Sequence, residues 1–143
     1  NGSLTVVDTA GGGLGNIWQL VMLSKCVLVP TSLSWSDVRP TIDFVNELSE
    51  RKDANGMSSP HIIIVPNRIS PQQRNLEALT EAIGDMNVIL APSVSDLSIV
   101  RNQAANFTGM AGVSGTRFHN EITRLGDFIG NYVLSGKLDE YYE

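Results

Sequence analysis

The chain has 143 residues, of which 42% are hydrophobic and 17% are charged, and its formal net charge at pH 7 is −5. A chain of this length fits one domain with a sizeable core, and its apolar content excludes an intrinsically disordered protein. The excess of acidic residues argues against a strongly basic nucleic-acid module.

Four short apolar runs are predicted to form β-strands. In chain order they are Leu4 to Asp8, Cys26 to Pro30, His61 to Pro66 and Val88 to Pro92. These runs do not alternate between apolar and polar residues, which is typical of strands that are covered on both faces. Glycines at positions 11, 12, 13 and 15 interrupt regular structure directly after the first run.

Helical patterns lie between and after these runs. Several begin at residues that favour a helix start, which are capping side chains or, at residue 71, a proline in the first turn. In chain order the predicted helices cover residues 16–23, 36–48, 70–84, 99–107 and 116–134.

This order of strands and helices predicts one α/β domain over residues 1–143. We expect three layers, with a mostly parallel sheet and helices on both of its faces. In such sheets, ligands bind beyond the carboxyl ends of the strands. The segments at those ends are Asp8 to Gly12, Pro30 to Ser32, Pro66 to Arg68 and Pro92 to Val94.

The glycine cluster after Asp8 has three interpretations. A dinucleotide fingerprint would need a third glycine where Asn16 stands, and the Asp8 carboxylate would repel a pyrophosphate. A flexible turn is the structural interpretation. In the third, Asp8 holds Mg²⁺ through water, and the N–H groups of the following glycines meet a terminal phosphate.

Four segments resemble the ParA/MinD/Soj group of deviant-Walker P-loop ATPases, in the order that this family has them. They are Leu4 to Gly12, Ser24 to Asp37, Ile63 to Arg68, and Val88 to Gly109 with Ala105 and Gly109. The first is similar to the strand and switch II segment, and the third to the strand whose Asn faces adenine. The resemblance covers nearly the whole chain and implies the C-terminal part of a P-loop NTPase-like fold.

The resemblance implies a set of roles for individual residues. Asp8 would hold Mg²⁺ in its outer shell, and Gly11 and Gly12 would sense the γ-phosphate of ATP. Asn67 would bind the adenine edge, and the walls around the base would come from Arg68, Pro92 and Val94. The whole protein is expected to form an ATP-dependent homodimer that binds nonspecific DNA and positions a plasmid, chromosome or other cargo. A partition partner would stimulate hydrolysis.

The lysine-rich loop that defines the family, K-G-G-x-G-K-T, has no match in these residues. The resemblance would then imply a truncated product, one part of a protein completed from elsewhere, or a degenerate relative. Because both catalytic lysines are missing, we expect the chain alone not to hydrolyse ATP. A nucleotide-free adaptor with the same fold stays open as an alternative.

A MinD-like membrane-cycling ATPase is the other alternative, but it needs a basic amphipathic C-terminal helix. Residues 137–143 are acidic on balance, so no membrane partner is expected. The chain shows no secretory signal, and its single cysteine excludes an internal disulfide, so we expect a cytoplasmic protein. The candidate DNA-binding residues are basic and lie in the last third of the chain: Arg101, Arg117, Arg124 and Lys137.

Overall fold

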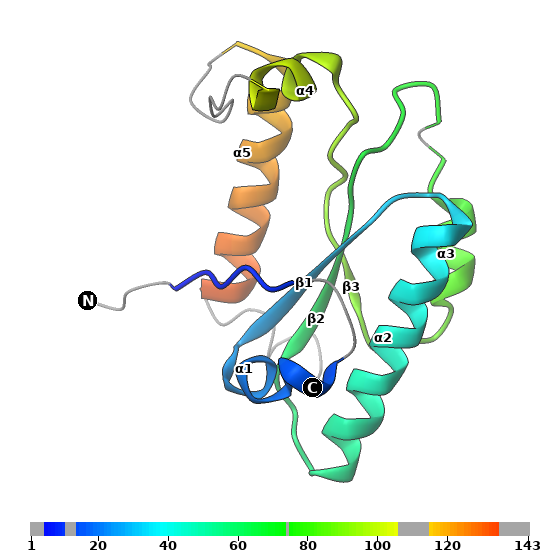
Figure 1. Cartoon of the computed structure of the whole chain (residues 1–143), viewed down its shortest axis with the longest axis vertical. Helices are drawn as coiled ribbons and strands as arrows, with labels where there is room; N and C mark the ends of the chain where they lie inside the picture. The colour runs from blue at the N-terminus through cyan, green and yellow to red at the C-terminus, as the bar shows by residue number, and fades with distance from the viewer. Residues whose placement is uncertain (1–4, 11–13, 74, 106–114, 135–143) are drawn as a thin grey trace.

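The computed structural model describes residues 5–10, 14–73, 75–105 and 115–134. It has an α/β fold around a three-stranded parallel sheet in the order β1-β2-β3 (Figure 1). The strands are β1 (Cys26–Thr31), β2 (His61–Pro66) and the two-residue β3 (Ile89–Leu90). The parallel sheet predicted from the sequence is therefore confirmed.

The central strand β2 is buried on both faces. Ile62 and Ile64 point into one core cluster, with Val45 and Leu48 of α2 (Trp35–Ala54). The alternate residues of β2, Ile63 and Val65, belong to a second cluster. Because both faces of the strand are buried, its sequence is apolar without interruption.

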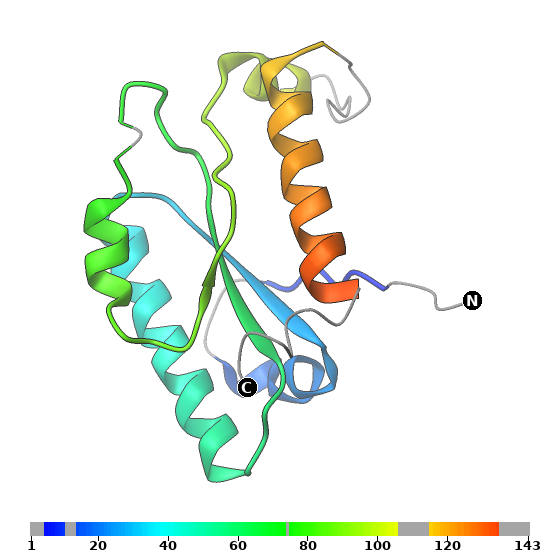
Figure 2. The same cartoon turned by 180° about the vertical axis from the view of Figure 1, so that it is seen from behind.

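Helices cover both faces of the sheet (Figures 1 and 2). Besides α2, the first cluster contains Leu79 and Ile83 of α3 (Glu77–Ile83). On the other face, the second cluster is closed by side chains of α5 (Arg117–Ile129) and of the π-helical turn η2 (Gly130–Leu134) that follows it. The other helical elements are η1 (Leu14–Asn16), α1 (Trp18–Leu23) and α4 (Ser98–Ala105).

Local sequence signals explain why two of the helices form. In α2, the buried side chains of Val38, Thr41, Val45 and Leu48 recur at helical spacing, as an amphipathic helix requires. The N-cap of α5 is Thr116, whose side-chain oxygen accepts a hydrogen bond from the backbone N–H of His119 at 3.1 Å. The predicted last helix is thus confirmed, with its α-helical part ending at Ile129.

The strand predicted from Leu4 to Asp8 is not formed over its described residues, 5–8. They have no regular structure, and the side chains of Val6 and Val7 are 82% and 58% exposed. A strand is stable only when its backbone groups pair in a ladder, and the described ladders join β1 to β2 and β2 to β3.

The predicted helix start at Ser70 is also wrong, because α3 begins at Glu77. The Ser70 carbonyl oxygen instead accepts a hydrogen bond from the backbone N–H of Gln73 at 2.9 Å, which closes a turn. The side chain of Asn75 accepts from the backbone N–H of Glu77 at 2.9 Å. Ser and Asn side chains favour such local turns as well as helix caps, which made the true start hard to predict.

Candidate functional site

The segments that follow the three strands lie side by side at the carboxyl edge of the sheet. The backbone N–H of Asn67 donates to the carbonyl oxygen of Thr31 at 2.8 Å, and that of Val94 donates to Pro66 at 2.8 Å. Ile69 forms a parallel bridge with Ser95 beyond the strands. The edge at which sequence reasoning placed the function is therefore a continuous backbone platform.

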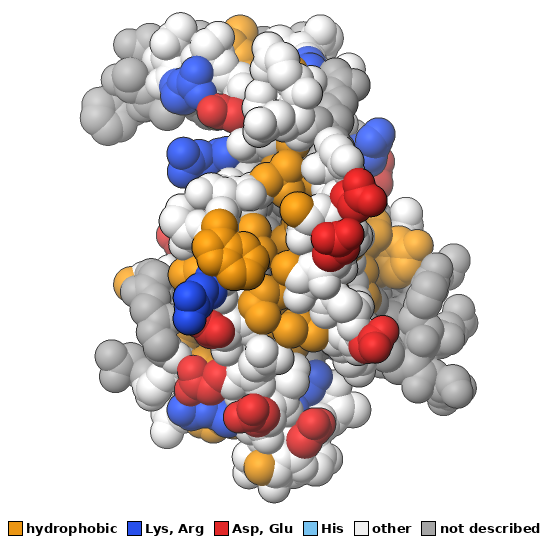
Figure 3. Space-filling model, turned by 90° about the vertical axis from the view of Figure 1, so that its right-hand side faces the viewer, with side chains coloured by type: hydrophobic (Ala, Val, Ile, Leu, Met, Phe, Trp, Pro, Cys, Tyr) orange, Lys and Arg blue, Asp and Glu red, His pale blue; other side chains and the backbone are white. Residues whose placement is uncertain are grey.

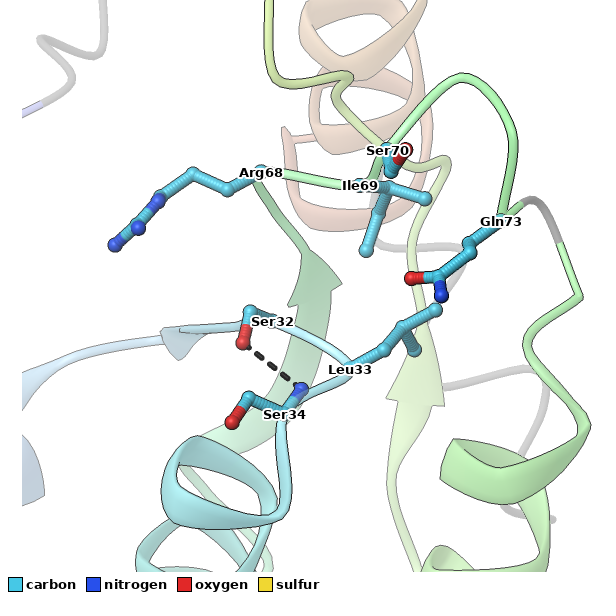
Figure 4. Close-up of a pocket in the computed structure, with 7 residues that line it drawn as sticks. All are labelled: Ser32, Leu33, Ser34, Arg68, Ile69, Ser70 and Gln73. Atoms are coloured by element: carbon cyan, nitrogen blue, oxygen red, sulfur yellow. Dashed lines mark hydrogen bonds between the residues drawn. The ribbon is translucent and has the colours of Figure 1, made fainter.

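A cavity of about 280 Å³ opens at this edge (Figure 4). One wall comes from the loop between β1 and α2, and the other from the loop between β2 and α3. The lining residues are Ser32, Leu33, Ser34, Arg68, Ile69, Ser70 and Gln73. The lining side chains supply hydroxyl groups and a carboxamide beside the apolar Leu33 and Ile69, with no carboxylate among them, so the cavity suits a hydrogen-bonding ligand.

The first wall is held by hydrogen bonds at the start of α2. The Ser32 hydroxyl donates to Asp37 Oδ2 at 2.6 Å and accepts from the backbone N–H of Ser34 at 3.0 Å, the bond drawn in Figure 4. The hydroxyls of Ser34 and Ser36 are 2.7 Å apart. Asp37 also places a negative charge in the first turn of α2, where the helix dipole favours it.

The second wall begins with a residue in an unusual backbone conformation. Arg68 has φ = 58°, in the left-handed region that favours glycine. The backbone N–H of Arg68 donates a hydrogen bond to Asn67 Oδ1 at 3.0 Å. The Arg68 side chain is exposed and extends away from Gln73 (Figure 4). Its guanidinium is therefore exposed to solvent and points away from the other residues that line the cavity.

The predicted adenine-site residues lie at this edge but in different settings. Arg68 lines the cavity, Asn67 is half-buried beside it, and Pro92 is half-buried after β3. Val94 is only 6% exposed, so it contributes its backbone to the platform and its side chain to the interior.

The predicted phosphate-site residues are not part of the cavity lining. Asp8 is exposed, and Gly11 and Gly12 lie outside the described residues. Of the lining residues, sequence reasoning missed Leu33, Ser34, Ile69, Ser70 and Gln73. The sequence at Ser70 predicts a helix cap and at Gln73 predicts no role, since the composition of a polar loop does not reveal which cavity its residues face.

The predicted DNA-binding arginines have different surroundings. Arg101 pairs with Asp96, and Arg117 pairs with Glu121 at 2.7 Å between Nε and Oε1. Arg124 is exposed on α5, and Lys137 lies outside the described residues. In two of the three described arginines, a paired carboxylate thus offsets the positive charge that DNA binding would need.

Other groups offer little chemistry within the described ranges. No cluster of three or more His, Cys, Asp or Glu side chains there could hold a metal ion. Burial raises the pKa of the Cys26 thiol, which makes it a poor nucleophile. Among the helices described, none is long and apolar enough to cross a bilayer.

Comparisons with known proteins found no similar protein. The sequence matches no family model and no curated protein, and the fold matches no solved structure. The structure by itself defines an α/β domain with a cavity, lined by polar and apolar side chains, at the carboxyl edge of its parallel sheet.

Proposed function

We propose that this chain is the adenine-binding part of a ParA-like, P-loop NTPase-like partition ATPase. The observation that carries the proposal is the meeting of Asn67 and Arg68 with the ends of β1 and β3 beside a cavity that has hydroxyl and carboxamide groups in its lining. Ligands of open α/β sheets bind at this edge. The Asn67-Arg68 pair is the segment whose family counterpart faces adenine.

The chemistry of the residues present suits a nucleotide. Arg68 offers an exposed positive charge to phosphate or to the face of a base, and Asn67 offers amide donors. Asp8 is an exposed carboxylate that can hold a hydrated Mg²⁺ through water, as the family resemblance implies. When bound, Mg²⁺ would supply charge neutralisation at the phosphates.

The wider activity is proposed from the same resemblance. It comprises an ATP-dependent homodimer, binding to nonspecific DNA, and hydrolysis stimulated by a partition partner. With no lysine-rich loop in these residues and two arginines engaged in ion pairs, we expect this chain to bind nucleotide without turnover and DNA weakly.

The proposal is tested by measuring the affinity of Mg-ATP for the chain by calorimetry. We expect Asn67→Ala and Arg68→Ala each to weaken binding by about tenfold, the equivalent of about 1.4 kcal/mol. The matched controls are Asn46→Ala on α2 and Arg124→Ala on α5, since both residues are exposed and neither lines the cavity. Equal losses in test and control variants, or no binding by wild type, contradict the proposal.

A nucleotide-free adaptor is the second candidate, and exposed apolar side chains favour it; Figure 3 shows hydrophobic side chains at the surface of one face of the molecule. Leu23 is 86% exposed, and Trp35, next to the cavity wall at Ser34, is 66% exposed. Large exposed aromatic residues are enriched where proteins bind one another. The same titration separates the two functions, because an adaptor gives no ATP-dependent heat.

A further inference from the structure

The carboxylate of Glu121 joins α5 to the segment that follows β3. Glu121 Oε2 accepts from the backbone N–H of Ser95 at 2.7 Å, and Oε1 accepts from the Ser95 hydroxyl at 2.8 Å. Oε1 also accepts from Arg117 Nε at 2.7 Å, while Arg117 Nη2 donates to the Ser95 hydroxyl at 2.8 Å. The three residues thus form a closed hydrogen-bonded triangle, in which Ser95 lies 22 residues before Arg117 and 26 residues before Glu121.

This triangle differs from an ordinary surface ion pair. The Glu121 side chain is 17% exposed, whereas Glu47 in the comparable i,i+4 pair with Arg51 is 43% exposed. A shielded carboxylate that receives several hydrogen bonds holds its partners more firmly than an exposed one. In agreement, the pKa of Glu121 is lowered: partial burial alone would raise it, but the bonds from Ser95 and Arg117 outweigh burial.

Ser95 connects the triangle to the segment that lines the cavity. It forms the parallel bridge with Ile69, and the backbone N–H of Ile69 donates to the Val94 carbonyl oxygen at 3.1 Å. The N–H of Asp96 donates in turn to the Ile69 carbonyl oxygen at 2.9 Å. Ile69 is 3% exposed and lines the cavity, so hydrogen bonds connect α5 through residues 94–96 to one cavity wall.

We propose that Glu121 is a positioning residue for the cavity: by fixing Ser95 it holds the Arg68–Ile69 wall in place. The alternative is a purely structural bond that only attaches α5 to the sheet. Apolar packing already provides that attachment, because Leu125, Phe128 and Ile129 of α5 pack against the buried side chains of β2 and Ala91. The triangle acts at the other end of α5, next to the segment that borders the cavity wall.

Amide hydrogen exchange in the ligand-free chain tests the positioning directly. Glu121→Gln replaces one of the two accepting oxygens with an NH₂ group, which cannot accept a hydrogen bond. At least one bond of the triangle is therefore lost. We expect the Ile69 and Asp96 amides to exchange at least about tenfold faster, which a loss of about 1.4 kcal/mol produces. The Val38 amide, bonded to Ser34 at the opposite wall, should be unchanged.

Glu47→Gln is the matched control, since it removes the same charge from an i,i+4 pair on α2. Ser95→Ala is the second test variant, because it removes only the hydroxyl contacts and keeps the Ser95 amide bond. It should give a smaller acceleration at the same two amides. If Ile69 and Asp96 exchange at wild-type rates in both Glu121→Gln and Ser95→Ala, the proposal is overturned.

A second readout, which rests on the proposed function, is the affinity for Mg-ATP. We expect Glu121→Gln to weaken it about threefold to tenfold and Glu47→Gln to leave it unchanged. Faster exchange with unchanged ATP affinity overturns the positioning role toward the nucleotide. If wild type binds no ATP while exchange at Ile69 and Asp96 accelerates, the proposed function fails and the positioning of the wall is supported.

Discussion

The backbone N–H of Asn67 donates to the carbonyl oxygen of Thr31 at 2.8 Å, which extends the pairing of β1 and β2 beyond the last residue of β2. The hydrogen bond fixes the backbone of Asn67 at the edge of the sheet. Its carboxamide oxygen is then engaged by the N–H of Arg68 at 3.0 Å. The side-chain NH₂ group of Asn67 is consequently presented from a rigid base rather than from a loose loop.

This arrangement leads to a prediction about base preference. If Asn67 reads the base, Asn67→Ala should reduce the preference of the chain for ATP over GTP by about tenfold, since a lost amide contact weakens binding by about 1–3 kcal/mol. Competition between the two nucleotides measures the ratio. An unchanged ratio, with Asn46→Ala as the control, places the base elsewhere.

The positive φ of Arg68 predicts an inverted order of stability for two variants. Alanine normally stabilises a protein relative to glycine, but at φ = 58° a side chain is strained and glycine is not. We expect Arg68→Gly to be about 1 kcal/mol more stable than Arg68→Ala in urea unfolding. An Arg68→Ala variant that is the more stable of the two contradicts the left-handed conformation.

Two leucines test where the core lies. Leu48 of α2 is fully buried in the core cluster that contains Ile62 and Ile64 of β2, whereas Leu23 at the end of α1 is 86% exposed. Leu48→Ala should lower the free energy of unfolding by about 2–5 kcal/mol, because it leaves a cavity. Leu23→Ala should change it by less than about 0.5 kcal/mol. Similar losses in the two variants would place Leu23 in a packed interior.

The triangle around Glu121 predicts a dependence of stability on pH. Because the pKa of Glu121 is lowered in the folded chain, its contribution is present above its ordinary pKa of 4.5 and is lost as the pH falls through the folded value. Urea unfolding at pH 7 should therefore show a larger difference between wild type and Glu121→Gln than unfolding in strong acid. A difference that does not change with pH indicates that the charge of Glu121 is not involved.

The sequence predicted the sheet better than the site. Unbroken apolar runs such as Ile62 to Val65 identify buried parallel strands, because burial on both faces leaves no polar positions. The run at Val6 and Val7 has the same composition but no described ladder partner, and composition does not reveal pairing. The lining residues Ser34 and Gln73 were missed because their role depends on how two loops meet. Glu121 was missed because its partner Ser95 is 26 residues away.

Mapping of amide chemical shifts during a titration with Mg-ATP tests most directly the proposal that nucleotide binds at the carboxyl edge of the sheet. We expect the largest shifts at Ser32 to Ser34, at Asn67 to Ser70, and at Val94 and Ser95, and smaller shifts when GTP is added at the same concentration as ATP. The end of α2, at Lys52 to Ala54, serves as the internal reference, since it is remote from the cavity lining. Shifts that are absent, or that centre on a region away from these three segments, contradict the claim.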